Sequence, residues 1–312
     1  MEKLLVVGVD TVTGANVALA STDRYEVLGI SSHHRLAFDS FAAEHVHWGD
    51  VEAVARLVDD FRPSWILHCG PLSASSWDMP AADPAWEREP QVVRALLECA
   101  RTQDARLTVV LTDAVFTGPR MFHDESSPTA SQHPAAVHAL AVEQLLADTM
   151  ALVVRTHVYG WSPTGTEPGT AERIWQALSA GTPAAPDGRR YATPILASDL
   201  AELLHRAHQL NLQGLLHLTG AERTSPFRLA SQMASAAGLP GPCSQVGLVE
   251  SSDDQLDCLN ETSLSSRRGR RTLESPMPML REGLQRFVEQ AHSGWRERSR
   301  LAQHVPAHDQ AA

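Results

Sequence analysis

Short apolar runs alternate with amphipathic stretches over the first half of the chain. The runs have the length and the β-branched content of buried strands, and the stretches between them repeat apolar residues at helical spacing. Val54, Leu57, Val58 and Phe61, for example, fall on one helix face at i, i+3, i+4 and i+7. The predicted elements are an apolar run and glycine turn within 4–14, a helix at 15–21, a strand at 25–31, a helix at 51–61, a strand at 65–70, a helix at 84–102, a strand at 107–112, a helix at about 134–148 and a strand at 151–156.

This alternation predicts βαβ units and therefore a Rossmann-type α/β fold, a doubly wound parallel sheet covered by helices. Right-handed crossovers would place the ligand-binding loops at the carboxyl ends of the strands. After Gly160 the pattern changes to loops and short helices, which indicates a smaller C-terminal domain of the substrate-binding type. The predicted organisation is a nucleotide-binding domain at 1–160, a mainly substrate-type domain at 161–291 that is partly interleaved with it, and a polar, frayed tail at 292–312.

An arginine cluster, RRGRR at 267–271, stands out in the second half of the chain. It falls in a segment, 239–275, that we predict to be irregular. We interpret the cluster as a solvated charge run, with phosphate binding by its arginines as the alternative. The elements predicted around it are a helix that begins at Asp199, a strand at 214–220, and helices at 225–238 and about 279–291.

Composition narrows the classes of function. The net charge of −11 and the pI of about 5.7 argue against a nucleic-acid or anionic-membrane surface, because phosphate binding draws on clustered positive charge. No apolar run approaches the roughly 18 residues of a membrane span, and the N-terminus enters a strand at once. We therefore expect no transmembrane helix, no signal peptide and a cytoplasmic protein.

The cysteines and histidines do not indicate a metal site. The cysteines lack CxxC spacing, which favours reduced thiols over a disulfide or a zinc site. His45 and His47 would point the same way on a strand, but no third ligand is evident, so we expect no metal. The four cysteines are Cys69, Cys99, Cys243 and Cys258.

Five segments, in order and at matching spacing, resemble one enzyme family. They are LTDAVFTG (111–118), HDESSPTASQHP (123–134), VVRTHVYG (153–160), YATPILASDLAELL (191–204) and GLLHLTG (214–220). Over about 4–290 the chain resembles the extended short-chain dehydrogenases, specifically their dTDP-4-dehydrorhamnose reductase branch. That branch also contains the regulatory β subunit of methionine adenosyltransferase. The resemblance implies an NAD(P)-binding Rossmann domain and the reduction of a nucleotide-linked 4-keto-6-deoxysugar.

The family's cofactor turn, TGxxGxxG, corresponds here to residues 7–14. Gly8 and Gly14 keep the first and last glycines, which make the tight turn and let the helix pack on the strand. Thr11 replaces the middle glycine and adds a branched side chain where a phosphate should lie. We expect weakened dinucleotide binding, with a hydroxyl still able to bond a phosphate oxygen. The alternative is a turn that merely connects strand and helix.

Other candidate cofactor residues follow from the same resemblance. Asp50 matches an acid that reaches the adenine, although it would serve equally as a helix N-cap. Cys69 and Gly70 stand at a strand end where the backbone would approach the cofactor. Ser32 and Arg35 follow the second strand, where an acid would hold the ribose of NAD, so their presence favours NADP over NAD.

The catalytic residues implied by the family are largely missing. The family uses a Thr or Ser with a Tyr and a Lys in YxxxK, and Thr112 matches the first of these. If Glu143 marks the family's Glu four residues after the Lys, Ala135 and Ala139 occupy the Tyr and Lys positions. A shift of one residue places Pro134 and His138 there instead. The only lysine of the chain is Lys3, far from this helix.

Three hypotheses remain open. The leading one is a pseudoenzyme that binds a nucleotide, a sugar nucleotide or a partner protein without hydride transfer, because losing both catalytic side chains should cost several powers of ten in rate. The second is an active NADP-dependent reductase or epimerase that uses Thr112 and His138, whose ordinary pKa near 6.5 suits proton transfer. The third is a structural or assembly subunit, a homo-oligomer included, that binds no nucleotide.

Overall fold

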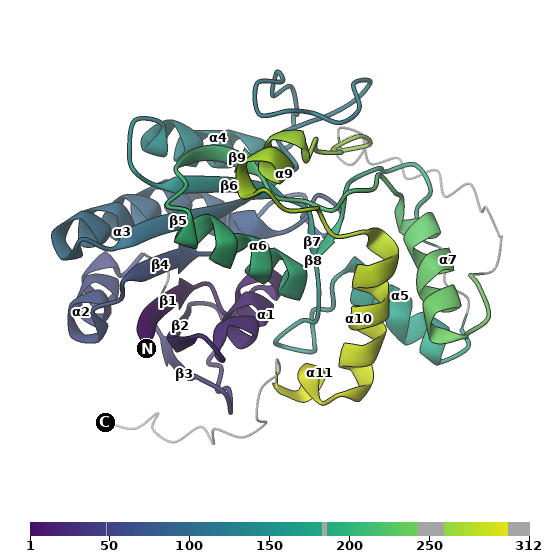
Figure 1. The fold of residues 1–312 in the computed structure, drawn as a ribbon, viewed down its shortest axis with the longest axis horizontal. Coiled ribbons are helices and arrows are strands. Elements are labelled where there is room, and N and C mark those ends of the chain that lie inside the picture. Colours follow the sequence, from purple (N-terminus) through teal and green to yellow (C-terminus); the bar gives the residue numbers. More distant parts are fainter. Residues whose placement is uncertain (48, 183–185, 243–258, 299–312) are drawn as a thin grey trace.

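A seven-stranded, all-parallel sheet forms the centre of the molecule (Figure 1). The computed structural model describes residues 1–47, 49–182, 186–242 and 259–298. The strand order is β3-β2-β1-β4-β5-β6-β9, so the predicted Rossmann-type fold is confirmed. The strands of this sheet are β1 (Glu2–Val7), β2 (Tyr25–Ser31), β3 (Ala42–His45), β4 (Trp65–His68), β5 (Arg106–Thr112), β6 (Leu152–Thr156) and β9 (Gly214–His217).

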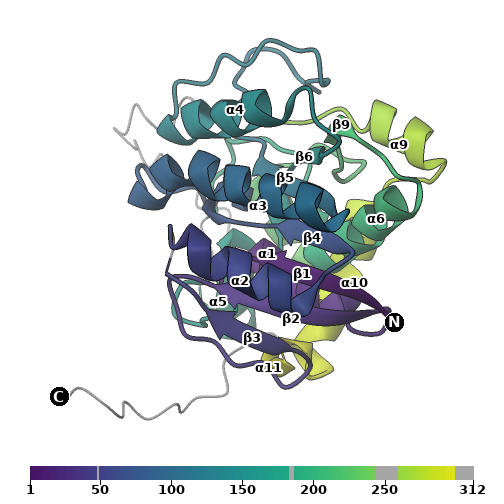
Figure 2. The same ribbon diagram turned by 90° about the vertical axis from the view of Figure 1, so that its left-hand side faces the viewer.

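Helices cover both faces of this sheet, as Figure 2 shows. On one face lie α2 (Val51–Phe61), α3 (Glu89–Gln103) and α4 (Pro134–Leu146), and on the other lie α1 (Val12–Ser21) and α6 (Ala197–Gln209). The core follows the two-residue period of the strands. Leu5 and Val7 pack toward α2 and α3, whereas Leu4 and Val6 pack toward α1 and α6. Both faces are therefore buried, as a parallel sheet requires.

A third hydrophobic cluster lies beyond the sheet and is built mainly from the second half of the chain. Within this cluster Trp161 stacks on Phe287, and their ring centroids are 4.2 Å apart. Because α6 and β9 return to the main sheet while later helices join this cluster, the two parts of the fold are interleaved in sequence. The elements around this cluster are α5 (Thr170–Ser179), α7 (Pro226–Ala237), α10 (Leu280–His292) and the two-stranded sheet of β7 (Val158–Tyr159) and β8 (Ile195–Leu196).

Two local predictions in the C-terminal part are wrong. The arginine run forms a helix, α9 (Arg267–Leu273), rather than an irregular stretch. Its Gly269 lies against β9, and a Cβ there would be 2.5 Å from His217 O, so a close contact places this helix. The chain after His292 is also structured. Helix α11 (Trp295–Arg298) packs back onto α1 through a 2.9 Å bond from Trp295 Nε1 to Asn16 Oδ1, whereas residues 299–312 lie outside the described part.

The predicted elements of the first half are present with shifted ends, and the structure adds strand β3 and short 3-10 turns. The helix predicted at 84–102 begins with a separate 3-10 turn, η2 (Pro84–Arg88), before α3. Another such turn, η1 (Pro71–Ser73), follows β4. Cys69 and Cys99 are free thiols, as expected, and Cys243 and Cys258 are outside the described residues. Within the described ranges, each helix is too short or too polar to cross a bilayer.

Candidate functional site

The turn between β1 and α1 keeps the close packing for which glycines are needed. Gly8 has a φ of +96°, and a Cβ at this position would lie 2.2 Å from Cys69 O. A Cβ at Gly14 would lie 2.1 Å from Gly8 O. Both residues therefore act through backbone approach, since any side chain would push the helix off the strand. Cys69 itself is fully buried and supports the turn from the adjacent strand.

Thr11, at the middle position of this turn, uses its hydroxyl within the protein. It is the N-cap of α1, where Thr11 Oγ1 accepts a 2.9 Å hydrogen bond from Gly14 N. The same oxygen donates toward Gly8 O and Cys69 O, each 2.9 Å away. In this arrangement the hydroxyl is unavailable to a phosphate. The amides of Val12 and Thr13, in the first helical turn, are left without intrahelical partners.

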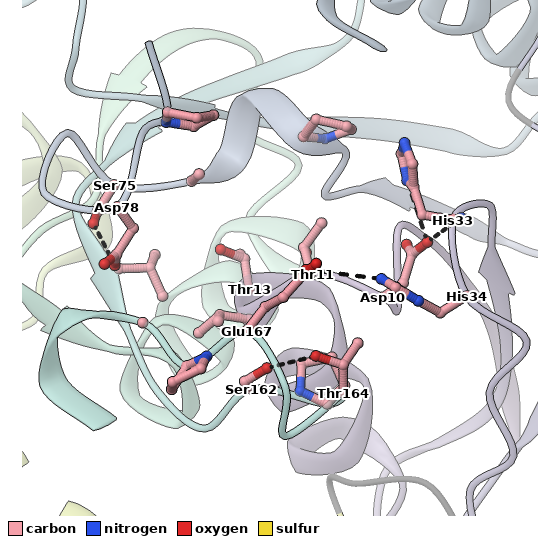
Figure 3. Close-up of a pocket in the computed structure, with 18 of the residues that line it drawn as sticks. Asp10, Thr11, Thr13, His33, His34, Ser75, Asp78, Ser162, Thr164 and Glu167 are labelled. Atoms are coloured by element: carbon pink, nitrogen blue, oxygen red, sulfur yellow. Dashed lines mark hydrogen bonds and ion pairs between the residues drawn. The ribbon is translucent and has the colours of Figure 1, made fainter. Parts of the chain in front are cut away.

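A cleft of about 820 Å³ opens at the carboxyl edge of the sheet, above the β1–α1 turn (Figure 3). Its position is the point where the strand order reverses, between β1 and β4, which is where open α/β sheets bind ligands. The loop at 162–169 and the start of α5 form its far wall. Its lining includes Asp10, Thr11, Val12, Thr13, His33, His34, Pro71, Ser75, Asp78, Asp83, Trp86, Ser162, Thr164, Glu167 and Arg173.

One end of the cleft is held together by Asp78. Its Oδ1 accepts hydrogen bonds from Thr170 N at 2.6 Å and Thr170 Oγ1 at 2.7 Å, while its Oδ2 accepts one from Ser75 Oγ at 2.9 Å. Arg173 approaches the same carboxylate at 3.5 Å. The carboxylate thus caps α5 and ties it to the loop after β4. These bonds fix the width of the cleft between the sheet and the second half of the chain.

The opposite end of the cleft is organised by Asp10. Its Oδ2 accepts hydrogen bonds from Ser32 N at 2.8 Å and His33 N at 2.7 Å, the first amides beyond β2. Burial alone would raise the pKa of Asp10, but the hydrogen bonds from His33 and Ser32 outweigh it and the pKa is lowered. The pKa of His33 is raised in turn, chiefly by its hydrogen bond with Asp10.

The remaining predicted cofactor residues lie away from the lining of the cleft. Ser32 presents its backbone to Asp10, and Arg35 is exposed. Asp50 is the N-cap of α2, where its carboxylate accepts a 3.0 Å bond from Ala53 N. The carbonyl of Cys69 faces the turn, and Gly70 packs against the carboxylate of Glu89. Within the described residues, Thr11 alone of the predicted set lines the cleft.

The predicted catalytic helix, α4, presents packed alanines rather than an open surface. Ala135 and Ala139 are both 0% exposed and belong to the hydrophobic cluster that contains Leu72 of η1 and Trp86 of η2. Glu143, which set the register, forms a bidentate ion pair with Arg155, at 2.6 Å to both Nε and an η nitrogen. The space beside the Tyr and Lys positions is therefore filled by the protein itself.

Thr112 and His138 are not brought together at the cleft. Thr112 is fully buried, and its Oγ1 accepts a 3.0 Å hydrogen bond from Ala114 N. His138 is half-buried on α4, beside the exposed Val137. Neither residue belongs to the lining of the cleft in the described part of the chain. The geometry therefore provides no acid-base pair facing a ligand at this position.

A buried polar cluster that was not predicted from the sequence lies at the carboxyl ends of β5 and β6. Asp113 Oδ2 accepts bonds from His157 Nδ1 at 2.7 Å, Ser76 Oγ at 2.8 Å and Thr262 Oγ1 at 2.5 Å. Burial alone would raise the pKa of Asp113, but the charge and hydrogen bond of His157 lower it. Asp113 and His157 stand in the quoted segments LTDAVFTG and VVRTHVYG, so their places at strand ends were the available signal.

A second buried pair joins β4 to α3. His68 Nε2 is 2.9 Å from Glu89 Oε2, and both side chains are fully buried. His68 ends β4 and Glu89 begins α3, so the pair joins the strand to the helix that follows it. Among the described residues, no group of three His, Cys, Asp or Glu side chains is placed to hold a metal ion.

The strand order and the glycine turn define a Rossmann-type α/β fold. The chain belongs to the RmlD family, because the family model for the RmlD substrate binding domain matches residues 2–293. The predicted resemblance to the dTDP-4-dehydrorhamnose reductase branch is thereby confirmed. No curated protein matches the sequence.

Solved structures support the same fold at low sequence identity. A hypothetical dTDP-4-dehydrorhamnose reductase from Sulfolobus tokodaii has a TM-score of 0.73 and 20% identity, covering 89% of this chain and 97% of its own. The Bordetella bronchiseptica enzyme WbmG, in complex with NAD and UDP, has a TM-score of 0.74 and 15% identity, covering 97% and 99%. The Bacillus anthracis dTDP-4-dehydrorhamnose reductase, in complex with NADP, has a TM-score of 0.68 and 18% identity, and the match covers 93% of this chain and 99% of that chain.

Proposed function

We propose that this protein is a non-catalytic member of the RmlD family that binds a nucleotide ligand in the cleft without hydride transfer. The proposal rests on the buried alanines that α4 carries at the candidate catalytic positions. Ala135 and Ala139 stand at the Tyr and Lys positions and are sealed in the core. A catalytic acid or base must reach the reacting atom within hydrogen-bond distance. Neither these alanines nor Thr112 offers such a group to the cleft.

The features that bind a nucleotide are better preserved than those that would reduce a sugar. Gly8 and Gly14 keep the close approach of α1 to β1, and the first turn of α1 opens into the cleft. A helix N-terminus favours phosphate through its free amides and its dipole. Relatives of the same fold are described in complex with NADP, or with NAD and UDP, which supports a nucleotide as the ligand here.

A dinucleotide would fit the turn in part. The amides of Val12 and Thr13, at the N-terminus of α1, would hold a pyrophosphate, whereas Thr11 adds a side chain and ties up the amide of Gly14. Carboxylates outnumber the single Arg173 in the lining, and this balance weakens anion binding further. We therefore expect a modest affinity, set by the β1–α1 turn. A sensing or regulatory subunit, rather than a catalyst, is the role that fits such binding.

Ligand-induced stabilisation and turnover, measured on one preparation, test the proposal. Ligand at 100 times its dissociation constant should add about 2.7 kcal/mol of stability. We expect a rise in Tm with NAD, NADP or a nucleoside diphosphate, and no oxidation of the reduced dinucleotide with a dTDP-4-keto-6-deoxysugar. A Gly14→Val variant should lose the rise, while Gly241→Val, at a glycine with open space around it, should keep it.

Two outcomes would overturn the proposal in different ways. Turnover at the rate of an active reductase, abolished by His138→Ala, would favour an enzyme with rearranged chemistry. No rise in Tm with any nucleotide would favour an assembly subunit that binds none.

A further inference from the structure

One end of the cleft carries the buried carboxylate of Asp10. Asp10, the residue before Thr11, projects from the β1–α1 turn toward the end of β2 (Figure 3). There its carboxylate accepts hydrogen bonds from the amides of Ser32 and His33, and its side chain is only 3% exposed. In dinucleotide-binding folds this is the position at which a protein contacts the ribose that is far from the reacting ring. The acid that usually stands at the end of the second strand is absent here.

Asp10 occupies the donors that a phosphate would need. The amides of Ser32 and His33 are both bonded to Oδ2, so an added phosphate would meet a carboxylate instead of N–H groups. Like charges in a poorly solvated site repel strongly. Asp10 lines the cleft, and both printed backbone bonds use Oδ2, so a ligand hydroxyl would be received by the other carboxylate oxygen, Oδ1.

The basic side chains near this end each face a carboxylate or lie outside the lining. His33 lies 3.5 Å from Asp10 and also faces the carboxylates of Asp83 and Glu167. His34 is 3.8 Å from Glu167. Each imidazole is therefore matched by at least one carboxylate. Arg35, the remaining cation of this loop, is exposed and outside the lining.

We infer that Asp10 selects a ligand whose ribose carries free hydroxyls and excludes one with a ribose 2′-phosphate. This inference rests on the proposed function, because it assigns the ligand class of the same cleft. It reverses the preference for NADP expected from Ser32 and Arg35. Specificity comes from an acid in the glycine turn, which replaces the acid normally supplied by the second strand.

Isothermal titration of the full-length protein with NAD and NADP tests the inference. We expect NAD to bind at least about tenfold more tightly than NADP, as expected for one repelled charge at short range. Asp10→Asn should reduce this ratio several-fold, with far-UV circular dichroism and Tm showing that the variant folds. Glu26→Gln is the matched control, because it removes one exposed carboxylate at the other end of β2 and should leave the ratio unchanged.

The results separate failure of this inference from failure of the proposed function. Binding of NADP as tightly as NAD, or a ratio unaffected by Asp10→Asn, overturns the assignment of Asp10 and leaves nucleotide binding intact. No binding of either dinucleotide, of ADP or of UDP overturns both. If UDP, rather than NAD or ADP, shows the dependence on Asp10, the free ribose belongs to a sugar nucleotide. If Asp10→Asn changes the binding of both NAD and ADP, the free ribose belongs to an adenosine ligand.

Discussion

A lysine at Ala139, the position that the Glu143 register assigns to the family's lysine, should destabilise this protein rather than restore a catalytic group. The Cβ of Ala139 is buried in a close-packed cluster between α4 and the turns after β4. Ala139→Lys would insert three further carbons and an ammonium group into this space, and overpacking of that kind costs about 1–3 kcal/mol. The new ammonium would be removed from water as well, at an effective cost of several kcal/mol when it is unpaired. We therefore expect a total loss of at least about 3 kcal/mol.

Thermal unfolding measures this loss against a control on the same helix. Because each kcal/mol shifts the Tm of a domain of 150–250 residues by about 2–4 °C, Ala139→Lys should lower it by roughly 6 °C or more. Ala141→Lys introduces the same side chain at an exposed position two residues away and should change stability by less than about 0.5 kcal/mol. Equal Tm values for the two variants would refute the packed site. So would reductase activity in an Ala135→Tyr/Ala139→Lys double variant.

Three further changes test separate parts of the structure. Glu143→Ala leaves the buried Arg155 unpaired and should cost about 3–5 kcal/mol in urea unfolding; a cost below 1 kcal/mol would show that the pair is not buried in solution. Thr11→Gly frees the amide of Gly14 and should tighten binding of a nucleoside diphosphate in titration calorimetry, whereas weaker binding would mean that the threonine contacts the ligand. The charge and hydrogen bond of His157 hold the pKa of Asp113 below its ordinary value although burial alone would raise it, so Asp113 contributes stability above its unfolded pKa that is lost as the pH falls through its folded pKa. The stability difference between the parent and Asp113→Asn should therefore shrink below about pH 4, and a pH-independent difference would contradict the assigned charge.

The fold could be predicted because its signals are local. The apolar runs around Val6 and around Ile66 each predict a buried strand. The glycines at 8 and 14 mark the turn between the first strand and the first helix. Prediction failed where a tertiary contact decided the structure. The arginines after Ser266 form a helix because its Gly269 packs on β9, a contact that charge patterning does not reveal.

The candidate site was less predictable for the same reason. The chemistry of Thr11 depends on Cys69 O, which is 58 residues away in sequence. Asp10 had no family role to suggest it, and its significance comes from bonds to the two amides after β2. The buried bond between Asp113 and His157 joins two neighbouring strands. Sequence patterning could indicate which residues end strands, but not which of them would meet or be enclosed.

The most direct test of binding without catalysis is single-turnover transfer of deuterium from a reduced, deuterated dinucleotide to a 4-keto-6-deoxysugar nucleotide. The protein should be in excess and saturated, as established by titration on the same sample, and the sugar should be analysed by mass spectrometry. We expect bound ligand and no deuterium in the sugar beyond the protein-free control. Transfer on the time scale of an active dTDP-4-dehydrorhamnose reductase measured alongside would contradict this expectation.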